Sequence, residues 1–326
     1  MPSTDSITDV PGVKVGHYSD YEHGTGATVC IFEAGAAGSV DVRGLATGSR
    51  ELPVLDPLHV TEKCHGLCLA GGSAFGLAAA DGVMKYLAEQ GIGYMARVAL
   101  VPIVPAAIIF DLSFISADVR PDASFGYAAC EAATAEPVES GCVGAGTGAT
   151  VGKILGIENA TKGGVGSASV RSPEGVTVGA LSVVNNLGDV LDMETGAVLA
   201  GARDPSSGKY ANTEKLLREG APVESPAGGE NTNLVAVATD AALDKAGAAK
   251  LARMASAGMA RVLAPAHSVF DGDLVFAFST GDKPLDINRL GAMAAHAVAL
   301  SINRAVTEAS SLGGVPACGA LQQKKE

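Results

Sequence analysis

The chain has 326 residues, of which 47% are hydrophobic and 18% are charged, and its formal net charge is −12. This hydrophobic content is enough for a large buried core, and it excludes a disordered chain, which combines low hydrophobicity with high net charge. The acidic balance argues against nucleic acid as a partner, because a phosphate backbone attracts basic surfaces.

The chain shows no export signal and no long apolar run. Its first residues lack a basic region followed by an apolar stretch, so we expect a cytoplasmic protein with no membrane span. The six cysteines are expected to be free thiols. Cys64 and Cys68, with His65 between them, form a small cluster, but no second pair of zinc ligands follows at similar spacing. We therefore expect neither a metal nor a cofactor.

The first half of the chain is expected to contain short strands, two helices and a glycine-rich loop. Strands are predicted where β-branched and apolar residues run up to glycine turns, at 13–18, 27–32 and 64–70. Helical spacing predicts one helix from Ser73, its expected N-cap, to about residue 90, and a second over 123–135. The glycine-rich loop covers 141–152.

The glycine-rich loop does not match a nucleotide-binding motif. A Walker A loop needs glycine where Thr147 stands, and Ser or Thr where Ile154 follows Lys153. The third glycine of a dinucleotide fingerprint is replaced by Ala149. Nucleotide binding is therefore not expected.

The second half mixes strands and helices without regular βαβ repetition. We expect a strand pair over 176–185 and 189–193 that turns at Leu187-Gly188, then a polar, turn-rich stretch over 201–231. A strand over 232–239, a helix over 241–263, a strand over 274–280 and a closing helix over 287–310 follow. This order predicts a single α/β domain, residues 1–326, in which helices cover layered sheets.

The junction of Asn231 and Thr232 is a candidate site of chemistry, because it joins the polar stretch to an apolar strand. A threonine hydroxyl is a weak nucleophile that needs a base. When threonine is the first residue of a chain, its own α-amine, with a pKa of about 7.7–8.0, can serve as that base. The hypothesis therefore requires a backbone cut between Asn231 and Thr232.

Four other residues complete the hypothesis. Asp271 and Asp273, just before a strand, are expected to orient the Thr232 hydroxyl and handle its proton. Asn185 is expected to stabilise the oxyanion, and Lys153 to keep the carboxylates charged. Each residue could also have a purely structural role, because threonine favours strands, Asp-Gly and Asn favour turns, and lysine is usually solvated.

Seven segments, in chain order, resemble the L-aminopeptidase/D-amidase-esterase (DmpA-type) family, which includes β-aminopeptidases and the nylon-oligomer endo-hydrolase. The segments are 7–17, 25–29, 69–77, 146–153, 183–189, 231–240 and 270–276. The resemblance implies a four-layer αββα sandwich and a precursor that cuts itself into a large chain, 1–231, and a small chain, 232–326.

The resemblance also implies the activity. It implies an N-terminal-nucleophile hydrolase that cleaves amide bonds of short peptides or 6-aminohexanoate oligomers through an acyl-Thr232 intermediate and assembles as a homotetramer. In the nylon-oligomer branch, the positions matching Thr232, Asp271, Asp273, Lys153 and Asn185 carry catalysis.

The chain departs from the family pattern at two positions, and two alternative functions stay open. Phe110 stands where the nylon-oligomer branch has tyrosine, and Asn233 where threonine is common. Phe110, Phe75 and Tyr127 are predicted to line the substrate pocket. The alternatives are acyl transfer of the ornithine-acetyltransferase type, and an unprocessed binding protein without catalysis.

Overall fold

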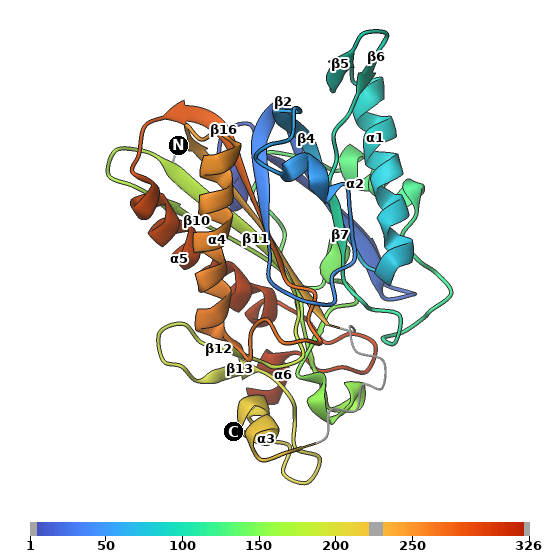
Figure 1. Cartoon of the computed structure of the whole chain (residues 1–326). Helices are drawn as coiled ribbons and strands as arrows, with labels where there is room; N and C mark the ends of the chain where they lie inside the picture. The colour runs from blue at the N-terminus through green and yellow to red at the C-terminus, as the bar shows by residue number, and fades with distance from the viewer. Residues whose placement is uncertain (1–4, 222–230, 323–326) are drawn as a thin grey trace.

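The computed structural model describes residues 5–221 and 231–322, and within these residues a nine-stranded sheet forms the centre of the fold (Figure 1). The strand order is β10-β11-β14-β16-β2-β4-β7-β3, and β1 pairs with β2 beside this path. The strands are β1 (Lys14–Asp20), β2 (Thr25–Val42), β3 (Ser49–Arg50), β4 (Lys63–Ala70), β7 (Ala106–Ile108), β10 (Gly164–Arg171), β11 (Thr177–Asn185), β14 (Thr232–Ala241) and β16 (Leu274–Lys283).

The long strand β2 divides this sheet into two layers. Its register with β4 shifts between Ile31 and Ala36, and Gly35 there has a φ of 71°, a left-handed conformation that glycine adopts without strain. The part before the shift pairs with β1, whereas the part after it pairs with β16. The two halves face each other across one core, in which the rings of Phe32 and Phe278 lie 4.6 Å apart.

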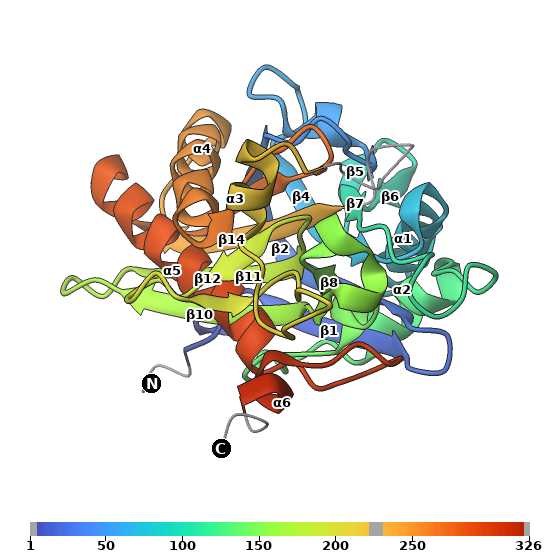
Figure 2. The same cartoon turned by 90° about the horizontal axis from the view of Figure 1, so that it is seen from below.

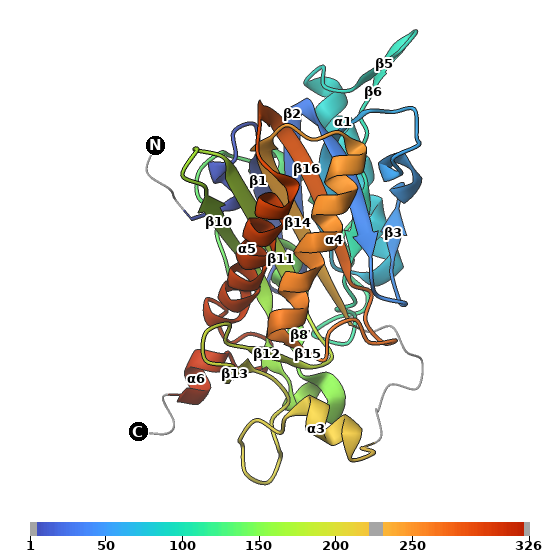
Figure 3. The ribbon, with the colours of Figure 1, turned by 60° about the vertical axis from the view of Figure 1, so that its left-hand side comes forward.

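Helices cover the outer face of each half. α4 (Lys245–Val262) and α5 (Ile287–Thr307) bury a second core against β11, β14 and β16 (Figure 3). α1 (Ala79–Glu89) and α2 (Ala123–Glu131) bury a third core against β2, β4 and β7 on the other side (Figure 2). This arrangement confirms the predicted four-layer αββα sandwich, and the two β-layers are joined through β2.

Glycines on the helices allow the backbones of neighbouring helices to come into direct contact. A Cβ on Gly82 would lie 1.8 Å from the carbonyl oxygen of Ala123, and one on Gly126 would lie 1.9 Å from that of Ala79. On the other face, a Cβ on Gly258 would lie 2.3 Å from the Ala295 carbonyl oxygen. A side chain at any of these three positions would push the paired helices apart.

Several predicted elements differ in detail. Ser73 is not an N-cap: it has a φ of 53° and begins a 3₁₀ segment, Ser73–Ala78, that precedes α1. The predicted pair over 176–185 and 189–193 is also wrong, because β12 (Asp189–Leu191) pairs with β13 (Val198–Ala200) and β15 (Leu263–Ala264). The reason is that the carbonyls of Asn186 and Leu187 accept from the amides of Gly152 and Lys153, so the chain cannot turn back there.

The predicted polar stretch 201–231 is not wholly irregular. It contains the short helix α3 (Thr213–Arg218), capped by the side chain of Asn212, which accepts from the Lys215 amide. Residues 222–230 of that stretch lie outside the described residues. Among the described helices, none combines the length and the apolar composition of a membrane span.

Strand directions bring distant segments together at one end of the sheet. β11 runs antiparallel to β14, so Asn185 at the end of β11 pairs with Thr232 at the start of β14. β14 runs parallel to β16, and Asn231, directly before β14, bridges to Asp271, directly before β16. The candidate residues of the site therefore meet at this end.

Candidate active site

Thr232 is the first residue of β14 and only 1% of its surface is exposed. Its hydroxyl Oγ1 donates to the carbonyl oxygen of Asn231 across 2.6 Å. The nucleophile expected from the sequence therefore lies against the carbonyl group that the proposed self-cleavage would attack.

The Asn231 carbonyl oxygen has a second donor. Asn231 forms an isolated parallel bridge with Asp271, and the backbone N–H of Gly272 donates to the Asn231 oxygen across 2.8 Å. The side-chain Oδ1 of Asn231 is buried and has no hydrogen-bond partner in the described residues. The backbone around this peptide bond is thus held by the Asp271-Gly272-Asp273 segment.

Asp271 is a fully buried carboxyl group. It accepts from the hydroxyl of Ser268 and, across 3.3 Å, from the amide of Leu187. Burial and then the charge of Asp273 raise the pKa of Asp271 to about 6, while Ser268, Leu187 and Lys153 act in the opposite direction. A carboxyl group with this pKa can exchange a proton near neutral pH.

Asp273 is fully buried as well, but it is surrounded by donors. Its Oδ1 accepts from the backbone N and the Nδ2 of Asn233, each across 2.9 Å. Its Oδ2 accepts from the backbone N of His267 across 3.1 Å, and it lies 2.9 Å from His267 Nδ1. Asp273 therefore fixes the residue next to the nucleophile, which gives Asn233 a structural role.

Lys153 and Asn185 form one polar unit. Lys153 Nζ donates to Asn185 Oδ1 across 2.7 Å, and the Thr150 amide donates to the same oxygen across 3.0 Å. The amide Nδ2 of Asn185 donates to the Phe110 carbonyl oxygen across 3.1 Å. One hydrogen of the expected oxyanion donor is therefore already used by Phe110.

Three groups of this site were not among the sequence candidates: His267, Ser268 and the backbone amide of Gly272. His267 has a φ of 56°, an unusual conformation for a non-glycine residue, and its side chain is 23% exposed. A serine and a histidine three to six residues before the aspartates are a local signal that sequence reading alone can detect.

The two other predicted pocket residues lie elsewhere. The Phe75 ring is 58% exposed and lies 3.9 Å under the Arg120 guanidinium. The Tyr127 hydroxyl on α2 donates to Glu89 across 2.7 Å. None of these contacts involves Thr232 or the aspartates, and a substrate role for Phe75 or Tyr127 stays a prediction.

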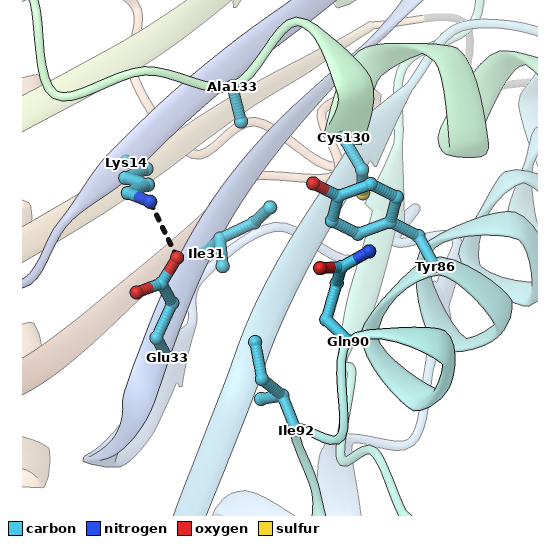
Figure 4. Close-up of a pocket in the computed structure, with 8 residues that line it drawn as sticks. All are labelled: Lys14, Ile31, Glu33, Tyr86, Gln90, Ile92, Cys130 and Ala133. Carbon is cyan, nitrogen blue, oxygen red and sulfur yellow. Dashed lines mark hydrogen bonds and ion pairs between the residues drawn. The ribbon is translucent and has the colours of Figure 1, made fainter.

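A separate cavity of about 280 Å³ lies between β1, β2 and the α1–α2 pair (Figure 4). The Lys14–Glu33 ion pair stands at one side, with Tyr86 and Gln90 on the other. Its lining does not include the catalytic candidates.

The cysteine pair singled out in the sequence is split by the fold. Cys64 and Cys68 lie in different hydrophobic cores, and both are free thiols. Burial raises the pKa of the Cys64 thiol to about 12, which disfavours the thiolate that binds metals. Within the described ranges, no group of three His, Cys, Asp or Glu residues could hold a metal ion.

Comparison with known proteins decides the family. The family description "Peptidase family S58" matches residues 5–317. The chain belongs to peptidase family S58. This S58 chain is 40% identical over 352 residues to an uncharacterized aminopeptidase of Mycobacterium leprae, with coverage of 96% of this chain and 93% of that protein.

A second relative carries a more specific name. The 6-aminohexanoate-oligomer endohydrolase of Kocuria sp. (strain KY2) is 33% identical over 282 residues, which cover 85% of the S58 chain and 75% of the relative.

Solved structures agree in fold. A Burkholderia sp. beta-aminopeptidase matches with a TM-score of 0.71 at 24% identity, covering 98% of the S58 chain and 93% of its own. The L-aminopeptidase D-Ala-esterase/amidase of Ochrobactrum anthropi, described as a variant of the Ntn hydrolase fold, matches with a TM-score of 0.72 at 19% identity, covering 96% and 88%. The S58 chain therefore has the Ntn-hydrolase fold, and its family makes it a hydrolase of amide bonds.

Proposed function

We propose that this S58 hydrolase activates itself by cutting between Asn231 and Thr232, and that Thr232 then acts as an N-terminal nucleophile. The supporting observation is the contact of Thr232 Oγ1 with the Asn231 carbonyl oxygen at 2.6 Å, next to two fully buried aspartates. The attacking hydroxyl, the peptide bond to be cut and the two carboxyl groups all lie at one end of the sheet. The products are a large chain, 1–231, and a small chain, 232–326, within a single folded domain.

The cut proceeds in two steps. Thr232 Oγ forms a bond to the Asn231 carbonyl carbon, and its proton passes through the Asp271–Asp273 pair to the Thr232 nitrogen as the C–N bond breaks. This step gives an ester between Asn231 and the Thr232 hydroxyl. Water then hydrolyses the ester, leaving an Asn231 carboxylate, a free hydroxyl and a free α-amine on Thr232.

The same groups then act on substrates. The α-amine of Thr232, with a pKa of about 7.7–8.0 before the site perturbs it, accepts the hydroxyl proton during attack on an amide carbonyl. The acyl-Thr232 ester is released by water. Lys153 and Asn185 keep the aspartates charged and the neighbouring backbone in place.

The proposed substrates are short peptides and 6-aminohexanoate oligomers. The names of the Mycobacterium leprae and Kocuria relatives support these two classes. Incubation of purified protein with both classes, followed by assay of released primary amines, tests the proposal. The acyltransferase and non-catalytic alternatives have no observation in the site that favours them.

A denaturing gel with N-terminal sequencing tests self-cleavage directly. Two bands, the smaller beginning at Thr232, are expected from active material. A single full-length band in material that hydrolyses amides would overturn the proposal.

We also propose that the processed protein assembles as a homotetramer in the cytoplasm. An apolar hairpin, β5 (Tyr94–Ala96) and β6 (Ala99–Val101), protrudes from the body, and Tyr94, Met95 and Val98 on it are exposed (Figure 1). Exposed apolar clusters of this kind are typical of protein interfaces. Six unpaired cysteines fit a reducing compartment. Light scattering of the eluted peak measures the subunit number.

A further inference from the structure

The carbonyl group to be cut already has a backbone donor on its oxygen. The N–H of Gly272 donates to the Asn231 oxygen across 2.8 Å, and that oxygen gains the negative charge when Thr232 attacks. The distance lies within the range of about 2.7–3.1 Å that oxyanion donors need. We propose that the Gly272 N–H is the oxyanion donor of the self-cleavage step, and that it afterwards binds the carbonyl oxygen of amide substrates.

A bond of this kind also occurs in any parallel bridge, so the position of the nucleophile matters. A Cβ on residue 272 would lie 2.7 Å from Thr232 Oγ1 and 2.6 Å from the Ala46 carbonyl oxygen. A side chain on residue 272 would therefore collide with the nucleophile and with the backbone at Ala46.

The charges around Gly272 make a donor necessary. Asp271 and Asp273 flank it and are fully buried, so a new negative charge beside them is costly without hydrogen bonding. The donor expected from the sequence, the Asn185 amide, uses one of its two hydrogens on the Phe110 carbonyl oxygen. Apart from the attacking Thr232 hydroxyl itself, the donor recorded on the reacting oxygen is the backbone N–H of Gly272.

In the attack, the Oγ–C bond forms and the C=O π electrons move onto the oxygen held by the Gly272 N–H. Collapse of this intermediate restores C=O as the C–N bond breaks. This assignment rests on the proposed function, and it adds the group that stabilises the intermediate.

The direct test replaces the amide of residue 272 with an ester. Cell-free translation with a tRNA that carries glycolic acid removes the N–H without adding a side chain. We expect self-cleavage to become about 10²–10³-fold slower, the usual cost of one oxyanion donor. The same ester at Gly314, an exposed position with no side-chain neighbours, is the control and is expected to cut normally.

The result also separates the two proposals. Cleavage within threefold of the normal rate in the Gly272 ester would overturn this assignment and leave self-cleavage intact. If the unmodified chain is never cut, self-cleavage itself fails.

A second measurement needs no altered backbone and covers the case in which the ester chain does not fold. Asp-Gly occurs twice in the sequence, at Asp81-Gly82 and Asp271-Gly272, so labelling with ¹³C′-aspartate and ¹⁵N-glycine selects two amide signals. A peptide boronic acid, which forms a tetrahedral adduct with the Thr232 hydroxyl, is added to the processed enzyme. We expect the Gly272 amide proton to move downfield while the Gly82 signal in α1 stays. Complete inhibition without movement of the Gly272 signal would contradict the assignment.

Discussion

Lys153 Nζ lies 2.7 Å from Asn185 Oδ1 and 3.3 Å from the Asn185 backbone oxygen, so these two residues form one unit. Asn185 is paired with Thr232 in the neighbouring strand, and the charge of Lys153 lowers the pKa of Asp271. The pair therefore connects the position of the nucleophile with the protonation of the acid beside it.

Replacement of the nucleophile is the first prediction. Thr232→Ala removes the hydroxyl that contacts the Asn231 carbonyl, so the chain is expected to stay uncut and inactive. Thr232→Ser keeps a hydroxyl at the same place and is the matched control. Intact mass measurement should find fragments of 231 and 95 residues in wild-type and Ser proteins only. A normal cut in the Ala variant would exclude the mechanism.

The pH dependence of self-cleavage is the second prediction. Burial and the charge of Asp273 raise the pKa of Asp271 to about 6. If Asp271 acts as an ionised base, the rate should be constant above that pH and fall about tenfold per pH unit below it. Freshly translated precursor transferred into buffers from pH 4 to 8 gives this profile on gels.

The raised pKa of Asp271 also predicts a pH-dependent stability, which the Asp271→Asn variant should lack. Because the folded pKa of Asp271 is above its ordinary value of 3.8, the unfolded chain releases this proton first. The Asp271 contribution to the free energy of unfolding therefore decreases as pH rises from about 4 to 6, by up to about 3 kcal/mol. Thermal melts of Thr232→Ala, with and without Asp271→Asn, should show this decrease only where Asp271 is present.

Loss of the Lys153 charge is the third prediction. Lys153→Met removes a positive charge that lowers the pKa of Asp271, so the acidic limb of the rate profile should move to higher pH. Lys153→Arg keeps the charge and should leave the limb nearer its original position. An unchanged limb in the Met variant would show that Lys153 does not act through Asp271.

His267 is the subject of the fourth prediction. Its Nδ1 and backbone N both contact Asp273 Oδ2, which in turn fixes Asn233 beside the nucleophile. His267→Ala is expected to slow self-cleavage about 10- to 100-fold, the value of a hydrogen bond to a charged group.

His267→Asn is the matched variant. Asparagine tolerates the positive φ of this position and offers an amide N–H where His267 has Nδ1, so it should restore most of the rate. Equal rates for the Ala and Asn variants would show that the hydrogen bond to Asp273 is not what matters.

Part of the order of elements could be predicted from the sequence, because apolar periodicity is a local signal. The strand over 232–239 and the helices over 241–263 and 287–310 correspond to β14, α4 and α5. The pairing of 176–185 with 189–193 could not be predicted, because the carbonyls of Asn186 and Leu187 bind backbone amides of the distant residues Gly152 and Lys153.

The motifs along the chain predicted the members of the site, and the structure brings them to one end of the sheet: Thr232, Asp271, Asp273, Lys153 and Asn185. The hydrogen-bond partners of each residue could not be predicted and depend on the three-dimensional fold. The Asn185 amide donates to Phe110, Asp273 holds Asn233 and His267, and Gly272 donates to the Asn231 carbonyl. The physical reason is that a motif fixes composition along the chain, whereas hydrogen-bond partners depend on how three strand ends and two loops meet in space.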